Sequence, residues 1–204
     1  MKKKLTLIAT AVALGALAVV GATMAYFTSQ DTATNVITTG NVQISIIEES
    51  TDDNTIMNEN GIQYVGAITP GQKISKVPTI KNDGNNDAYV RAYVEFKYYD
   101  KALNDITANF TGKEPEIKYN TVANAEGNYW IKNETAEGKV YYYYNKAIEA
   151  KTGKTTELFD TVTIPTEWNN DQANVTIEVI VHAEAIQSEN NGTDVVAAFN
   201  NFAN

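Results

Sequence analysis

The sequence predicts an all-β protein: an antiparallel β-sandwich of jelly-roll or immunoglobulin-like type, with short helical or irregular insertions. Two long segments alternate apolar and polar residues with a period of two. Shorter segments rich in Thr, Val, Ile and Tyr recur every ten to twenty residues, and helical periodicity is almost absent. Regularly spaced short strands of this kind are typical of sandwiches, but they leave the two topologies open.

The first element in the chain is a predicted secretory signal peptide, residues 1–25. Three lysines at positions 2–4 precede an uncharged stretch over residues 5–30. Thr23 and Ala25 supply small side chains at the third and first positions before a cut, so cleavage is expected before Tyr26. The alternative is a permanent anchor, because about 20 apolar residues can span a bilayer.

Cleavage would leave residues 26–204, which we expect to form a single β-sandwich domain. This chain has 13 basic against 25 acidic residues, and that excess of negative charge argues against nucleic acid or anionic lipid as a partner. The sequence contains no cysteine, so the fold cannot rely on disulfides. A secreted chain of this kind points to a bacterial or archaeal source.

The clearest predicted strands are residues 175–185 and 88–98. In the first, apolar residues at odd positions alternate with Glu178, His182 and Glu184, so one face is expected to be buried. A polar turn over residues 82–87 precedes the second. Five shorter strands are predicted, at residues 42–47, 74–81, 129–132, 140–145 and 158–164.

Three further local features complete this assignment. Pro78 cannot donate a ladder hydrogen bond, so its strand is expected at an edge or at a bulge. Residues 48–64 and 99–127 are predicted to be irregular. The spacing of Val195, Val196, Phe199 and Phe202 predicts a short C-terminal helix.

The sequence offers little catalytic chemistry, and no catalytic residue is assigned. His182 is the single histidine, and on a strand face shared with carboxylates it is interpreted as a solvated surface group. One histidine and no cysteine cannot supply a zinc site of ordinary composition. Nucleophilic catalysis lacks a base for the same reason, and no cofactor is predicted apart from calcium.

An acidic stretch is the candidate calcium site. Asp52, Asp53 and Glu59, with Asn54 and Asn60, provide oxygen ligands of the type that calcium accepts without strict spacing. The stretch lacks the EF-hand pattern, so a solvated loop is the simpler interpretation.

Four consecutive tyrosines, Tyr141 to Tyr144, could form a surface for sugars or partners. In a strand, however, two of them are expected to face the core and two to face outward. Ordinary packing therefore explains at least half of the run.

Several stretches resemble a known family, the TasA/camelysin (CalY) family. In that family a dedicated signal peptidase, SipW, cuts just before an aromatic pair, and here Tyr26 and Phe27 follow the predicted cut. The stretches that carry the resemblance are residues 21–35, 39–45, 68–74, 79–90 and 182–188. Residues 99–163 match nothing in the family pattern.

The resemblance implies a jelly-roll-like subunit of extracellular biofilm-matrix fibres in Gram-positive bacteria. Its partners would be copies of itself, a SipW-type peptidase during export, and an accessory assembly protein. Subunits would be joined by donor-strand exchange of residues 26–39, which contain Tyr26, Phe27, Val36 and Ile37. An extended segment of this kind can pair with a neighbour's open sheet edge. The alternative is an ordinary first strand of its own domain.

Two other function classes remain open at this point. Camelysin-like members are often labelled metalloproteases, but the ligand count gives no support for that label. A surface adhesin or glycan-binding module would use exposed tyrosines and the acidic stretch.

Overall fold

A computed structural model describes residues 25–28, 31–33, 42–53, 55–58, 61–66, 68–169, 172 and 175–202. These residues form strands and two short helices. In chain order they are β1 (Ala25–Thr28), β2 (Asp31–Ala33), β3 (Ile44–Glu49), β4 (Thr55–Asn58), β5 (Gly61–Gly66), β6 (Lys73–Ser75), β7 (Val77–Asn82), β8 (Ala88–Tyr99), the 3-10 helix η1 (Thr107–Phe110), β9 (Glu116–Tyr119), β10 (Trp130–Glu134), β11 (Val140–Tyr144), β12 (Phe159–Thr163), β13 (Thr176–Gln187) and helix α2 (Val195–Phe202).

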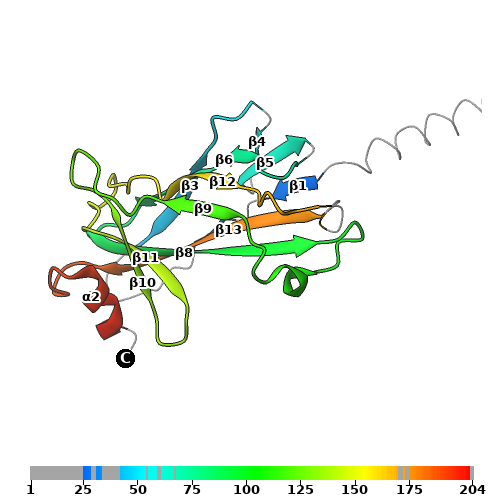
Figure 1. Ribbon diagram of the computed structural model, residues 1–204. Helices are drawn as coiled ribbons and strands as arrows, with labels where there is room; N and C mark the ends of the chain where they lie inside the picture. Colours follow the sequence, from blue (N-terminus) through cyan, green and yellow to red (C-terminus); the bar gives the residue numbers. More distant parts are fainter. Residues whose placement is uncertain are drawn as a thin grey trace, which may run out of the picture.

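The largest sheet has the order β10-β11-β8-β13-β1-β5-β4, with β2 also paired to β13. Its centre is the antiparallel ladder of β8 and β13, which pairs every residue of β13 from Thr176 to Gln187. Strands β6, β12 and β9 form a second sheet, and β3 and β7 form a third. In Figure 1, β6, β12 and β9 lie over β8 and β13. This arrangement confirms the predicted all-β sandwich.

The main core lies between these layers. The alternation in the two long strands places one face of each inside: Val90 and Ala92 of β8, and Val179, Val181 and Ala183 of β13, are fully buried. Ile44, Ile74, Ile80, Phe159 and Val162 of the opposite layer pack on this face. Burial of such side chains contributes roughly 1.5–3 kcal/mol each.

One ion pair lies inside this apolar layer. Lys76, between β6 and β7, pairs with Glu48 of β3, and both side chains are almost fully buried. Glu48 points inward because it continues the alternation of Ile44 and Ile46. A buried pair of this kind offsets its desolvation only while both partners are present.

A smaller core covers the opposite face of the large sheet. Helix α2 packs there, with Val195, Ala198 and Phe199 buried against Tyr89, Tyr143 and Ile186. The predicted C-terminal helix is therefore confirmed. Asp194 accepts hydrogen bonds from the backbone N–H groups of Val196 and Ala197, which caps the helix.

Two segments predicted to be irregular contain strands, and one predicted strand is divided. Residues 48–64 include β4 and most of β5, which pair as a hairpin. Residues 99–127 include η1 and β9. The predicted strand over residues 74–81 is split at Lys76 into β6, which pairs with β12, and β7, which pairs with β3.

Pro78 lies where a proline can be tolerated. Strand β7 forms a regular ladder only with β3, but residues 153–158 also bond to its other side, so it is not the free edge that was predicted. On the other side the Pro78 carbonyl accepts a hydrogen bond from the Leu158 N–H at 2.9 Å. Because N–H and C=O of one strand residue point to the same side, the nitrogen of Pro78 faces away from the β3 ladder.

Candidate functional site

The N-terminal strands lie along the free side of β13. Phe27 and Thr28 of β1 pair in parallel with Ile177 and Glu178, and Asp31 to Ala33 of β2 pair in parallel with Val181 to Ala183. Each of these residues pairs with the residue 150 positions later in the chain. The constant offset means that β1 and β2 pair with β13 in the same register.

The same segment connects two parts of the large sheet. On its other side β1 pairs antiparallel with β5, from Ala25 opposite Gly66 to Thr28 opposite Gln63. The hairpin of β4 and β5 therefore joins the sheet through β1. Removal of β1 would expose unpaired backbone groups on both β13 and β5, which is the edge that an extended segment can fill.

The predicted polymerisation residues are thus partly placed. Tyr26 and Phe27 belong to β1, on the chain's own sheet, as the alternative of an ordinary first strand describes. Val36 and Ile37 lie outside the described residues, as do Thr23 and most of the predicted signal peptide. Ala25 begins β1. Within the part of the chain that the structure describes, no helix is long and apolar enough to cross a bilayer.

His182 was interpreted as a solvated surface group, and this interpretation is wrong. Its ring stacks on the ring of Tyr93 at 4.3 Å between centroids, and its Nε2 lies 3.0 Å from a carboxylate oxygen of Glu95. Only 13% of the side chain is exposed. Tyr93 lies directly opposite His182 in the β8–β13 ladder, so cross-strand pairing produces the contact.

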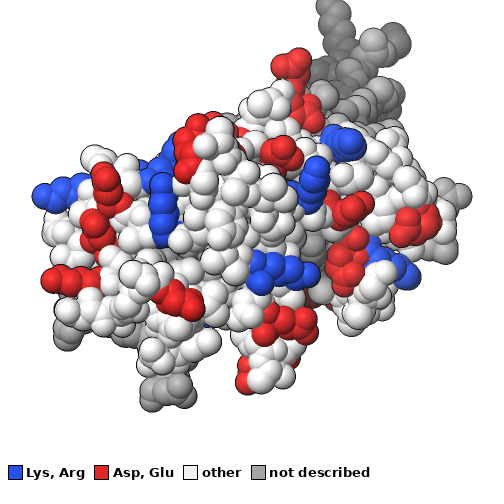
Figure 2. Space-filling view, turned by 60° about the vertical axis from the view of Figure 1, so that its left-hand side comes forward, with Lys and Arg blue, Asp and Glu red and all other residues white. Residues whose placement is uncertain are grey.

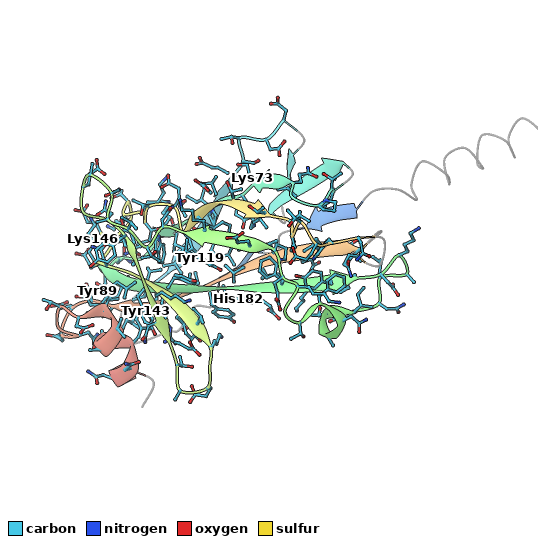
Figure 3. The ribbon with its side chains drawn as sticks, in the orientation of Figure 1. Lys73, Tyr89, Tyr119, Tyr143, Lys146 and His182 are labelled. Atoms are coloured by element: carbon cyan, nitrogen blue, oxygen red, sulfur yellow. The ribbon has the colours of Figure 1, made fainter. Side chains whose placement is uncertain are left out.

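The four tyrosines of β11 are all buried, so the prediction of two outward-facing rings is also wrong. Tyr142 and Tyr144 belong to the main core, and Tyr141 and Tyr143 belong to the smaller core beside α2. Figure 3 shows Tyr89 and Tyr143 beside the helix, with His182 farther along the strands. Because both faces of the sheet are covered at β11, these four tyrosines do not form an exposed aromatic surface of the kind that an adhesin would use.

Arg91, the one arginine of the sequence, has a role that sequence reasoning missed. It lies on β8 opposite Tyr143 and Glu184. Its Nε and Nη2 donate to one carboxylate oxygen of Glu184 at 2.7 and 2.6 Å, and its Nη1 lies 3.3 Å from the Tyr143 hydroxyl. The guanidinium also lies over the rings of Tyr141 and Phe199, at 4.1 and 4.7 Å. It therefore ties α2 to the sheet.

The acidic candidates for calcium are only partly described. Asp52 and Asp53 border a shallow hollow of about 400 Å³ that also contains Lys73. Strand β4 begins after Asp53, and Glu59 follows this strand, outside the described residues. Among the described residues no group of three or more His, Asp or Glu side chains could hold a metal ion. Calcium binding remains a prediction.

Charged residues are otherwise dispersed. On the face in Figure 2, Asp and Glu side chains alternate with Lys and Arg, and neither sign forms one continuous patch. This distribution gives the visible face no polyanion-binding surface.

Comparison with known proteins identifies the family. The sequence model of the family described as camelysin metallo-endopeptidase matches residues 1–179, so the chain belongs to this family. No curated protein and no solved structure matches. The family description implies a metal ion, but one histidine, paired with Glu95, and no cysteine do not fit a zinc site of ordinary composition.

Proposed function

We propose that this protein is a secreted structural subunit of extracellular fibres, joined by exchange of the N-terminal segment. The observation that carries the proposal is the docking of β1 and β2 on β13 in one parallel register. In the monomer this segment fills its own sheet. In a fibre the same segment of a neighbouring copy would fill it, and no catalytic site is needed.

Exchange of this kind replaces each contact that it breaks within a subunit with an identical contact between subunits. The incoming segment has the same sequence, so it forms the same hydrogen bonds with β13 and β5 that the chain's own segment forms. Domain swapping is a low-cost route to assembly for this reason. A high subunit concentration then favours assembly, and no new kind of contact between subunits is needed.

A cysteine pair can test whether the segment is exchanged. Thr28 pairs with Glu178, and the chain has no cysteine of its own, so Thr28→Cys with Glu178→Cys gives one disulfide between neighbouring strands. Oxidised fibres of this variant should resolve on a non-reducing gel as a ladder of covalent multimers. Reduction should collapse the ladder to a single band.

A second pair is the matched control. Lys97 and Glu178 face each other across β8 and β13, within one subunit in either case. Lys97→Cys with Glu178→Cys should therefore give monomers on the same gel. If fibres of the Thr28 variant also dissolve into internally bridged monomers, the segment stays on its own sheet and the proposal fails.

Deletion of residues 26–34 tests the same idea without cross-links. The proposal expects fibres to be lost from negative-stain micrographs, while the truncated chain binds an added peptide of residues 26–34. Normal fibres from the truncated chain would contradict donor-strand exchange.

Export and partners belong to the same proposal. Cleavage by a SipW-type signal peptidase before Tyr26 would release the segment as the mature N-terminus, and an accessory protein would start assembly at the cell surface or in the matrix. Mass spectrometry of the secreted chain should give a first residue of Tyr26. A membrane-bound chain that retains residues 1–25 would support the anchor alternative.

The family description makes peptidase activity the second candidate. A casein assay with and without a chelator tests it on the purified mature protein. Chelator-sensitive cleavage that is lost in His182→Ala would replace the structural role proposed above.

A further inference from the structure

A polar hollow lies on the outer face of the large sheet, at the hairpin of β10 and β11. It has a volume of about 610 Å³, which is the size range of small-ligand sites. Arg91 and Tyr141 line it from the sheet and Asn200 from α2, and the hairpin supplies Asn133, Glu134, Thr135, Ala136, Glu137 and Lys139. The fibre proposed above does not use this hollow.

Arg91 provides a fixed cation with spare donors. Of its five N–H groups, two donate to Glu184 and one to the Tyr143 hydroxyl. The other two have no acceptor within the described part of the chain. The rings of Tyr141 and Phe199 hold the guanidinium in place, so a ligand that binds it immobilises no flexible side chain.

Lys139 provides a second cation. Its Nζ lies 3.3 Å from the centre of the Tyr93 ring and 4.8 Å from that of Tyr141. Among the ion pairs of the described residues none involves Lys139. Burial opposes the charged form of Lys139, but its interactions with Tyr141 and Tyr93 outweigh this effect and raise its pKa, so the ammonium stays charged.

The aromatic rings and the polar rim of the hollow restrict the kind of ligand that can bind there. Arg91 covers the ring of Tyr141, and His182 and Lys139 cover the ring of the neighbouring Tyr93, so a ligand in the hollow cannot stack on these ring faces. The rim carboxylates Glu134 and Glu137 disfavour a dianion such as phosphate. Carboxylates, amides and a hydroxyl at the rim suit a ligand with many hydroxyl groups and one negative charge.

We propose that this hollow binds a carboxylated saccharide, with its carboxylate between Arg91 and Lys139 and its hydroxyl groups on the hairpin and α2. Arginine and carboxylate form paired hydrogen bonds of good geometry. The affinity for the saccharide should fall as the salt concentration rises, because Lys139 is exposed and salt screens its charge.

The single arginine makes binding directly observable. Its side-chain Nε–H gives one resonance in an ¹⁵N correlation spectrum. Titration of the folded monomer with galacturonate, which carries one carboxylate, should shift this resonance saturably, and neutral galactose should not. Titration with acetate tests whether any small carboxylate binds equally well. Equal binding of acetate or of galactose, or no shift with galacturonate, would overturn the proposal.

Two lysine variants complete the test. Lys139 is exposed, so Lys139→Ala should fold normally and weaken galacturonate binding about tenfold, which corresponds to 1.4 kcal/mol. Lys132 belongs to the same hairpin but lies opposite Tyr142, on the other sheet face, so Lys132→Ala should bind as the wild type does. Unchanged binding by Lys139→Ala, or an equal loss in Lys132→Ala, rules out the site.

Discussion

The inner face of β8 and β13 is lined by apolar and aromatic side chains, whereas the outer face carries Arg91, Tyr93, Glu95, His182 and Glu184. Both faces are covered, but in different ways. The inner face is closed along its length by the second layer, while α2 covers only one end of the outer face. The difference indicates that stability comes chiefly from the inner face, and that the outer face holds polar groups in fixed positions.

The largest effect is expected at the inner face. Phe159 is fully buried and packs edge-on against Tyr119 at 5.7 Å. Phe159→Ala should lower the free energy of unfolding by about 4 kcal/mol, because the layer cannot collapse around the lost ring. Urea denaturation followed by circular dichroism measures it. If Phe159→Ala loses less free energy of unfolding than the outer-face variants do, the inner face is not the main source of stability.

The buried ion pair is the exception to an apolar inner face. Lys76→Met removes the ammonium that neutralises the buried Glu48 carboxylate and should cost about 3 kcal/mol. The double variant Glu48→Leu with Lys76→Met should recover most of this loss in the same denaturation experiment. If the double variant is as unstable as the single one, the pair does more than compensate for its own burial.

On the outer face, Arg91→Met should cost about 2 kcal/mol. The variant loses the charged hydrogen bonds to Glu184 and the cation contacts with Tyr141 and Phe199, but keeps the apolar stem. Hydrogen exchange should increase in α2 more than in β13. Uniform exchange across both elements would show that Arg91 does not tie the helix to the sheet.

A smaller loss, about 1 kcal/mol, is expected for His182→Ala. The variant removes one stacked ring pair and one contact with Glu95. Thermal unfolding measures the change, and Lys97→Ala on the same face provides a control for a partly exposed side chain. A loss larger than that of Arg91→Met would mean that His182 has further partners.

The smallest effect belongs to the turn before β8. Hydrogen bonds from Lys81 and then from Ser45 hold the pKa of Asp83 below its ordinary value of 3.8. A lowered pKa stabilises the fold above that value, and the contribution is lost as the pH falls. Asp83→Asn should cost less than about 1 kcal/mol at neutral pH, and the difference from wild type should vanish in acid. If the stability difference between Asp83→Asn and wild type persists in acid, it does not come from the charge of Asp83.

Sequence periodicity predicted the two long strands that form the inner face, but it missed short strands and misjudged the tyrosines of β11. Alternation in residues 88–98 and 175–185 placed the two central strands, because one apolar face requires a period of two. Strands β4 and β9 have four residues each, too few for a period of two to mark them. The tyrosines of β11 were misjudged because a helix from the far end of the chain covers their second face.

The hollow at Arg91 could not be predicted for a related reason. Its lining comes from β8, the hairpin of β10 and β11, and α2, and no sequence motif connects these parts. The one available signal was the position of Arg91 between Tyr89 and Tyr93 in an alternating strand. That pattern places a cation among aromatic rings once neighbouring strands are known.

The single parallel register of β1 and β2 on β13 has a consequence for fibre growth. If each subunit gives its segment to the next, the two ends of the fibre are chemically different: one carries an unfilled β13 edge and the other a free donor segment. Such an assembly is polar, whereas reciprocal exchange between two copies would close it into a dimer that has no free end. A subunit that lacks residues 26–34 can accept a strand but cannot pass one on, so a small proportion of it would terminate elongation.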